Sequence, residues 1–284
     1  MRRIHMDVRL AILVAAGLCT GAAQNLPQTY IPQTKFSRGQ DVVPSFDGWI
    51  RNADGTFTMV FGYFNRNIEE ELAIPAGPDN KIEPGLPDQG QPTYFLPRRH
   101  AWVFRVKVPA DWGTSKELVW TLTSHGRTEK AYASLQPDEE ILERQIMTRG
   151  NLSPGLDDPN KPPSVSITPV QGASVDAPLV LTALVTDDGL PKPRAPKARP
   201  AVNTGKAQTN SAEARPRIGL NVTWFQYRGP AKVTFDDAGA ILVSNGQATT
   251  KARFPEAGVY VLRATANDGE LSTTSDVTVS VIGH

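Results

Sequence analysis

The chain has 284 residues, of which 39% are hydrophobic, and it carries 30 Lys and Arg against 29 Asp and Glu, for a formal net charge of +1. This length suggests roughly two domains, and the hydrophobic fraction allows packed cores but excludes a protein built mainly within a membrane. The balanced charge argues against a general nucleic-acid binder, which needs a basic excess to neutralise phosphates.

Residues 1–23 have the pattern of a signal peptide. Three arginines accompany a short apolar run at residues 10–18, which is too short to span a bilayer as a helix, and small residues then suit cleavage after Ala23. Two alternatives are an uncleaved anchor and a lipoprotein signal that uses Cys19, although Leu18 fits poorly the small residue that precedes a lipidated cysteine. We therefore expect an exported chain, periplasmic or extracellular, cleaved near Ala23.

The expected mature chain begins with an extended segment at residues 24–40. Loss of the signal removes three basic residues and one acidic residue, so the formal net charge becomes −1. Cys19 is the single cysteine and leaves with the signal, so stability must come from packing rather than from an internal disulfide. We expect no transmembrane segment in the mature chain, because no later apolar run is long enough.

From residue 162 onward, apolar residues alternate with polar ones in several short segments. This period of two is typical of a sheet that packs one face on a second sheet. The segments are residues 164–168, 179–185, 220–226, 233–235, 248–254, 260–266 and 277–281. Their number and spacing predict an immunoglobulin-like (Ig-like) sandwich over residues 162–284.

Two stretches of this half, LNVTWFQYRGPAKVTF and ATTKARFPEAGVYVLRATANDGELSTTSDVTVSV, resemble the polycystic-kidney-disease (PKD) type of Ig-like domain in exported bacterial proteins. The resemblance covers about residues 162–282 apart from an insertion. It is carried by Trp224, Gly229-Pro230, Gly258-Val259-Tyr260, Asn267-Asp268-Gly269 and the alternating terminal valines. It implies an Ig-like fold, an extracellular or periplasmic setting, and a role in spacing, presentation or binding rather than catalysis.

Two aromatic residues of this half have structural interpretations that need no resemblance. Trp224 lies on the apolar face in mid-strand, where a large ring can fill the space between two sheets. Tyr260 lies at the start of a strand, where its hydroxyl can bond back to a loop as in a tyrosine corner.

Residues 190–217 interrupt the alternating pattern. They contain five prolines, seven Lys or Arg and one acidic residue, a composition that resists folding because prolines remove donors and like charges repel. The flanking segments each need the other to bury an apolar face. We therefore predict a disordered basic loop inserted into one domain, which either contacts an acidic polymer or has no partner.

The first half, residues 41–136, also predicts a β-sandwich. Residues 57–63, 102–108 and 118–122 alternate, and residues 124–127 are typical of a hairpin turn. Residues 74–97 hold six prolines and are interpreted as a long constrained connection. This half resembles N-terminal segments of exported bacterial proteins of unknown role.

The two halves are joined by residues 137–161, where we expect a short helix and a Pro-rich linker. Acidic residues at 138–140 suit a helix N-terminus, and Gly150 suits its end. Four prolines between residues 151 and 163 predict a semi-rigid linker. The overall prediction is an all-β protein with two sandwich domains, the second of them Ig-like.

Catalytic signals are scarce. The chain has no HExxH, GxSxG, phosphate-loop or dinucleotide pattern, and only His100 and His125 lie away from its ends. We expect no catalytic residues and no enzyme activity, and the alternative is an unrecognised hydrolase that uses one of these histidines.

Acidic turns offer a candidate metal site. Asp187 and Asp188 follow the second predicted strand of the Ig-like half, and Asp268 follows the sixth, so the three carboxylates belong to the same end of the sandwich. They predict either a Ca²⁺ site, which requires several oxygen ligands, or ordinary turns in which Asp bonds the nearby backbone. No other cofactor is expected.

Two candidate ligand-binding features lie in the first half. Arg98 and Arg99 form a small basic patch or a solvated turn, and Trp112 lies in a turn where we expect an exposed ring. The other aromatic residues of this half, Trp102 among them, mostly lie in alternating runs and are interpreted as core.

These features favour an exported, non-catalytic interaction, adhesion or spacer protein of the cell envelope. Its expected partner is an unknown protein or a polysaccharide at the cell surface, with no nucleic acid. The alternative is a carbohydrate-binding accessory module that uses Trp112.

Overall fold

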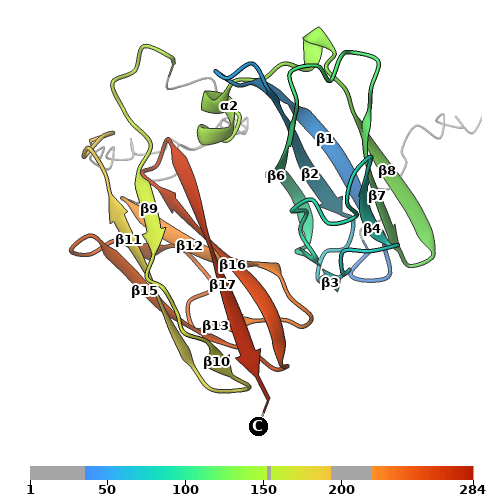
Figure 1. The fold of residues 1–284 in the computed structure, drawn as a ribbon. Helices are drawn as coiled ribbons and strands as arrows, with labels where there is room; N and C mark the ends of the chain where they lie inside the picture. The colour runs from blue at the N-terminus through green and yellow to red at the C-terminus, as the bar shows by residue number, and fades with distance from the viewer. Residues whose placement is uncertain (1–35, 152–154, 193–218, 284) are drawn as a thin grey trace, which may run out of the picture. The chain divides into compact units, whose positions relative to one another are not determined.

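The computed structural model describes residues 36–151, 155–192 and 219–283, and the described residues belong to one compact unit. Their regular secondary structure is almost entirely β-strand and forms two sandwiches (Figure 1), which confirms the predicted fold class. The expected signal peptide (1–23), most of the extended segment (24–35) and most of the inserted loop (193–217) lie outside the described residues.

The first sandwich has two three-stranded sheets and a two-stranded ribbon, all antiparallel. One sheet has the order β1 (Val42–Arg51), β2 (Phe57–Asn65) and β6 (Arg98–Val108). The other has the order β4 (Asn80–Glu83), β7 (Leu118–Ser124) and β8 (Arg127–Ala133). The ribbon pairs β3 (Leu72–Ala73) with β5 (Tyr94–Phe95).

Aromatic rings dominate the core of the first sandwich. The ring of Phe61 stacks on that of Phe104 at 5.1 Å between centroids, and Trp120 packs edge-on against Phe104 at 4.8 Å. The buried indole of Trp120 donates to Asn80 Oδ1 at 2.9 Å, as a buried Trp requires. The core therefore combines large apolar surfaces with a few buried amides.

The interpretation of residues 74–97 as a plain connection was wrong. This segment contributes β4, which pairs with β7, and β5, which pairs with β3. Asn80 anchors it, because its amide donates to the carbonyls of Ile74 and Pro92 at 2.9 and 2.8 Å. The signal was obscured by the prolines around these short strands. The hairpin turn at residues 124–127 is present, with positive φ at His125 (47°) and Gly126 (73°).

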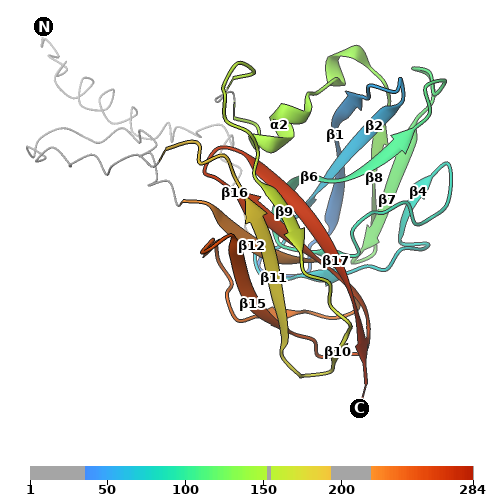
Figure 2. The same ribbon diagram turned by 60° about the vertical axis from the view of Figure 1, so that its left-hand side comes forward.

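The second sandwich packs a four-stranded sheet on a five-stranded sheet (Figure 2). The first has the order β13 (Thr234–Phe235), β15 (Gln247–Arg253), β11 (Leu179–Thr186) and β9 (Ser164–Ile167). The second has the order β10 (Ala173–Ser174), β17 (Ser272–Ile282), β16 (Gly258–Asn267), β12 (Asn221–Arg228) and β14 (Ile241–Leu242). The division of the strands between the two sheets, and their order in each sheet, are those of an Ig-like sandwich. The alternating pattern did not predict the short strands β10 and β14.

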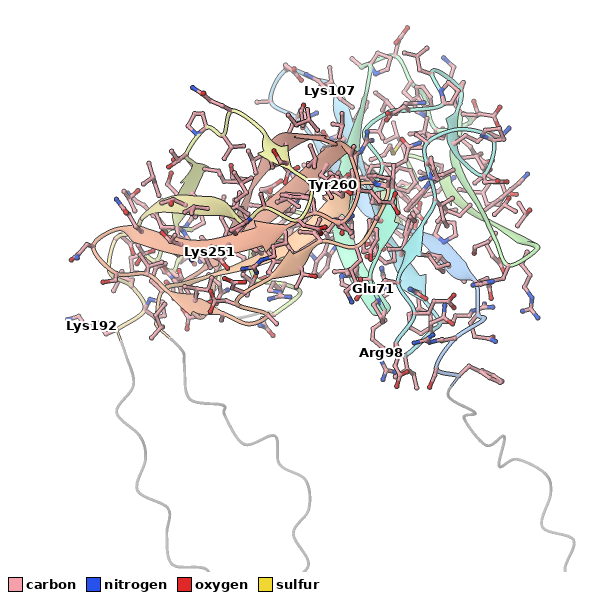
Figure 3. The ribbon with its side chains drawn as sticks, turned by 90° about the horizontal axis from the view of Figure 1, so that it is seen from below. Glu71, Arg98, Lys107, Lys192, Lys251 and Tyr260 are labelled. Atoms are coloured by element: carbon pink, nitrogen blue, oxygen red, sulfur yellow. The ribbon has the colours of Figure 1, made fainter. Side chains whose placement is uncertain are left out.

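Alternating apolar residues of both sheets form a second core. The strands on either side of residues 187–220, β11 and β12, lie in different sheets and contribute Leu181 and Val222 to it. Trp224 is only 7% exposed in this core. The side chain of Tyr260 (labelled in Figure 3) is fully buried, and its hydroxyl donates to the Glu256 carbonyl at 3.0 Å, which is the geometry of a tyrosine corner.

The prediction of one continuous helix over residues 137–150 was wrong, because the segment forms two separate short helices. A 3₁₀ helix, η1 (Pro137–Glu139), is separated from α2 (Glu143–Met147) by residues that pair with β1 instead. The Ile141 N–H donates to the Trp49 carbonyl at 2.8 Å, and Ile141 occupies the space above Gly48, where a Cβ would lie 2.7 Å from its Cγ2. Pairing with the edge of the sheet therefore outweighs the helical tendency of the segment.

Candidate functional site

The candidate site is centred on an irregularity in β6. Phe104 pairs with Phe61 of β2, but His100, rather than residue 102, pairs with Tyr63. Two extra residues are therefore inserted in β6 opposite Gly62, which makes residues 101–103 a bulge. Trp102 lies within it at a φ of 54° and Arg98 lies just before it at 80°, and such backbone strain in bulky residues persists only where the surroundings hold it.

A buried carboxylate holds this bulge in place. The side chain of Asp47 is 5% exposed, and its oxygens accept the Trp102 N–H at 2.7 Å and an Arg99 Nη2 hydrogen at 2.5 Å. Arg99 also donates to the His100 carbonyl at 2.7 Å. A Cβ on Gly62 would lie 2.4 Å from both Asp47 Oδ2 and the His100 carbonyl, so the bulge closes over a position that only glycine fits.

The bulge moves Trp102 out of the core. Phe104, Val106 and Val108 are buried in the first core, as their alternation predicts, whereas Trp102 is half-buried and does not belong to it. Its ring lies against the C-terminal end of α2, where a Cβ on Gly150 would be 3.0 Å from Cη2 of Trp102. The alternating pattern gave no sign of the two-residue insertion, so the sequence could not identify this ring as the one outside the core.

Tyr227 of β12 joins the second sandwich to the first. It is 5% exposed and packs in the aromatic core of the first sandwich, not in the core of its own. Its hydroxyl donates to the Gly90 carbonyl at 2.5 Å, and its own carbonyl accepts the Thr93 N–H at 3.3 Å. The two sandwiches therefore share an apolar contact and a backbone hydrogen bond.

Arg263 of β16 completes the joint. Its guanidinium lies 4.0 Å from the centroid of the Tyr227 ring, forms a two-pronged ion pair with Asp276 at 2.6 and 2.8 Å, and donates to the Val103 carbonyl at 2.5 Å. Val103 belongs to the bulge, so Arg263 satisfies a carbonyl that the sheet leaves unpaired. The Asp276 carboxylate, opposing the effect of burial, helps to raise the pKa of Arg263 above its ordinary value.

Ion pairs flank this joint at the surface. Arg228 bonds both oxygens of Asp88 at 2.7 and 3.0 Å, and Lys232 pairs with Glu71 (labelled in Figure 3) at 2.7 Å. These exposed pairs each contribute little stability. They match charges of the two sandwiches and so favour one orientation of the joint.

A cavity of about 840 Å³ opens beside the joint. We call it the bulge cleft and define it by Trp102 and Arg149 on one side and Tyr227 and Arg263 on the other. Four arginines and two carboxylates line it, so its lining carries an excess of positive charge. The cleft thus brings together a half-buried indole, hydroxyl side chains and cationic groups.

His100 lies at the cleft without a catalytic arrangement. Its ring stacks on that of Tyr63 at 4.9 Å, and its Nε2 lies 3.0 Å from the Pro97 carbonyl. Burial lowers the pKa of His100, and the charges of Arg99 and Arg149 lower it further. The other candidate histidine is His125, whose Nε2 lies 3.3 Å from Glu70 Oε2.

Of the residues predicted to bind a ligand, Arg99 lines the cleft, whereas Arg98 and Trp112 do not. Arg98 is exposed at the start of β6 (Figure 3), whereas Arg99 is held by Asp47 and lines the cleft. Trp112 is partly buried against the first core, donates to the Lys116 carbonyl at 3.2 Å and has the Lys116 ammonium 5.8 Å from its ring centroid. The structure therefore offers Trp102, rather than Trp112, as the indole at a cavity.

The predicted Ca²⁺ ligands are engaged mainly in turns. Asp188 accepts the N–H groups of Lys161 and Leu190, and Asp268 accepts those of Glu270 and Leu271. Within the described ranges, no group of three or more His, Cys, Asp or Glu is placed to hold a metal. Short turns consume the oxygens that a three-carboxylate site would need.

Part of this acidic end remains unpaired. Asp187 Oδ1 and Asp268 Oδ2 are buried and have no hydrogen-bond partner among the described residues. Burial raises the pKa of Asp187, and the Asp268 and Asp188 charges raise it further, against the bond from the Gly189 N–H. The two carboxylates thus lie close enough to repel each other.

Comparison with known proteins finds similarity only at the level of solved structures. A fragment of intimin, its D00-D0 domain, is 9% identical with a TM-score of 0.28, and the match covers 85% of this chain and 100% of that one. Domains 4 and 5 of the S-layer protein SbsC are 9% identical with a TM-score of 0.26, with coverage of 59% and 65%. Fibronectin(III)-like modules of Clostridium thermocellum CbhA are 12% identical with a TM-score of 0.23, with coverage of 86% and 95%.

No protein-family model matches the chain, and no curated protein matches it. None of the helices in the described segments has the length and apolar character needed to cross a membrane.

Proposed function

We propose that this chain is an exported, non-catalytic interaction or spacer protein of the cell envelope, with a second sandwich of the PKD type. The observation that carries the proposal is the joint at Tyr227 and Arg263. A spacer must hold its domains in a fixed relation, and a buried aromatic anchor with a cation over its ring is well suited to that task.

The histidines support a non-catalytic role. Among the described residues, neither His100 nor His125 is hydrogen-bonded to a Ser, Thr or Cys side chain, as a histidine that activates a hydroxyl or thiol nucleophile would be. The lowered pKa of His100 keeps it neutral in a cationic setting, and its ring is packed on Tyr63 rather than open to a substrate. Both histidines are better explained by packing and surface pairing.

Export is supported by the signal-like pattern of residues 1–23. N-terminal sequencing of protein secreted from the native host tests this part directly. We expect Gln24 as the first residue, and a protein that retains residues 1–23 in the cytoplasm contradicts it.

The spacer role is tested by unfolding of the full chain. A rigid joint predicts that both sandwiches unfold in one cooperative transition, because they share core contacts. Differential scanning calorimetry, with the ratio of calorimetric to van't Hoff enthalpy, measures this. Two separate transitions contradict a rigid joint, and a hydrolase turnover abolished by His100→Ala or His125→Ala contradicts the non-catalytic role.

A second candidate function is carbohydrate binding, and the bulge cleft favours it. The cleft displays the half-buried Trp102 beside hydroxyl side chains of β16 and β17. An aromatic face with nearby hydrogen-bonding groups is the usual composition of a small-ligand site. This candidate is compatible with a spacer, since a rigid joint would also fix the shape of the cleft.

A further inference from the structure

We propose that the bulge cleft binds an acidic sugar unit of a polysaccharide, with Arg149 contacting its anionic group and Trp102 contacting its ring. This inference rests on the second candidate function and names the site and the class of ligand. It differs from the spacer role, which concerns the joint that Tyr227 and Arg263 form at one side of the cleft.

The charge of the cleft selects an anion. Three of its arginines are already matched: Arg99 bonds Asp47 outside the cleft, Arg105 bonds Glu143 at 2.6 and 2.7 Å, and Arg263 bonds Asp276. Arg149 is exposed, and its guanidinium has no hydrogen-bond or ion-pair partner among the described residues. A planar guanidinium pairs in two-pronged fashion with carboxylates and similar oxyanions.

The backbone presents this arginine in a fixed place. Arg149 follows α2 with a φ of 54°, and Gly150 continues at 79°, so the chain leaves the helix in the left-handed region. The ring of Trp102 packs against Gly150, which brings the free cation and the indole to neighbouring positions. The charge of Arg149 lowers the pKa of His100, which lines the cleft. Arg149 therefore contributes to the electrostatic field inside the cleft.

The indole and the hydroxyl groups favour a sugar over a peptide. Thr265, Ser272, Thr273 and Thr274 line the cleft, and hydroxyls both donate and accept, as sugar hydroxyls require. β6 is an edge strand of its sheet, so a peptide could in principle add a strand there. The bulge at residues 101–103 breaks the ladder at this edge, and Arg263 already occupies the Val103 carbonyl, which disfavours strand addition.

Affinity electrophoresis of the full chain tests the proposal. The gels contain polygalacturonate, dextran sulfate, neutral dextran or poly-glutamate. We expect retardation by the acidic polysaccharides and none by neutral dextran, and the comparison of polygalacturonate with dextran sulfate shows whether the anionic group is a carboxylate or a sulfate. Arg149→Gln removes one charge-assisted contact and should weaken binding on the order of tenfold.

Matched variants separate the cleft from general charge and general aromatic content. Trp102→Ala should weaken binding to a similar extent, whereas Trp112→Ala and Lys116→Gln, which change an indole and a cation elsewhere, should leave it unchanged. Melting temperatures of all variants report whether each has folded, and Trp102→Phe keeps a ring if the alanine variant does not fold.

Three outcomes overturn the proposal. One is the absence of retardation on every acidic polysaccharide, and another is retardation that Arg149→Gln, or a folded Trp102→Ala variant, leaves unchanged. The third is equal retardation by poly-glutamate with the same dependence on Arg149, which would assign the cleft to acidic peptides. None of these outcomes affects the single unfolding transition or the signal cleavage expected of an exported spacer.

Discussion

The cores of the two sandwiches are filled by different kinds of side chain. The first has a core of large aromatic rings, with Phe61, Phe104 and Trp120 in mutual contact, and it buries polar amides such as that of Asn80. The second has a core rich in small residues, with alanines at positions such as 183, 252 and 264 that let its sheets approach closely. The two cores therefore differ in the size of the side chains that fill them.

Irregular strand pairing marks the place where the candidate site lies. The pairings of β11 with β15 and of β16 with β17 run without a register shift. Both strand pairings of the first sheet of the first sandwich contain one, and so does the pairing of β12 with β16, at Tyr227. A bulge redirects side chains from the core to the surface. The second sandwich supplies one side of the cleft from β12, β16 and β17, and the irregular β6 supplies the strained Trp102 of the other side.

The largest expected effect comes from removing the ring that the two cores share. Tyr227→Ala leaves a cavity in the aromatic core of the first sandwich, and such truncations cost about 3–5 kcal/mol. The loss should also uncouple the sandwiches, so that one transition becomes two. Chemical denaturation followed by tryptophan fluorescence and circular dichroism measures both effects.

Tyr227→Phe is the matched control for this change. It keeps the ring and loses only the hydrogen bond to the Gly90 carbonyl, so it should cost about 1 kcal/mol and leave a single transition. If the alanine variant were as stable as the phenylalanine variant, the ring would not join the two cores.

The second effect tests whether the bulge is rigid. Gly62→Ala places a Cβ 2.4 Å from both Asp47 Oδ2 and the His100 carbonyl, so β6 must shift, at a cost of about 1–3 kcal/mol. The shift should disturb Trp102 and thereby the cleft. Thermal unfolding measures the loss. Gly239→Ala, where φ is not in the left-handed region and nothing lies within 4 Å of the added Cβ, controls for the general effect of replacing a glycine. An equal loss in both variants would show that the bulge is not closed over Gly62.

The third effect concerns the regular sandwich. Tyr260→Phe removes the hydrogen bond to the Glu256 carbonyl and keeps the buried ring, so it should lower the free energy of unfolding by about 1 kcal/mol. Urea unfolding measures it. A neutral result would mean that the loop before β16 is held by packing alone.

The sequence predicted the regular sandwich far better than the irregular one. Alternation placed β11, β12, β15 and β16 within two residues of their observed bounds and found the second half of β17, because each strand has one apolar face and no bulge at its centre. It missed β4 because prolines surround a four-residue strand. It also missed the break between η1 and α2, because that break depends on pairing with β1.

The candidate site was predictable only in part. Arg99 was identified as part of a basic patch, but its bond to Asp47 joins residues 52 positions apart, which no local pattern reveals. Trp102 was assigned to the core because the two-residue insertion in β6 appears only in the pairing with β2. Tyr227 was overlooked because its side chain lies outside the core of the second sandwich. Alternation shows which face of a strand is apolar, but it does not show that another sandwich covers the opposite face.

The smallest expected effect lies at the acidic end of the second sandwich. There a substitution should raise, rather than lower, the free energy of unfolding. The folded pKa of Asp187 is raised above its unfolded value of 3.8, so the stability linked to its neutral form is present below pH 3.8 and is lost as pH rises through the folded pKa. At pH 7 the ionised carboxylate therefore opposes folding. Asp187→Asn removes the charge and keeps an oxygen for the Gly189 N–H.

Asp187→Asn should thus stabilise the protein at pH 7 by a few tenths of a kcal/mol, since the group is partly exposed and screened, and the gain should vanish near pH 3. Asp188→Asn is the control, because both Asp188 oxygens accept backbone N–H groups and the amide retains only one acceptor, so this variant should lose stability. Melting curves in EDTA measure both changes. Repeating them in millimolar Ca²⁺ sharpens the test: a cation that binds only the folded chain raises the melting temperature of the unmodified protein, and Asp187→Asn should then lose that rise. A destabilising effect of Asp187→Asn in EDTA would contradict the repulsion between Asp187 and Asp268.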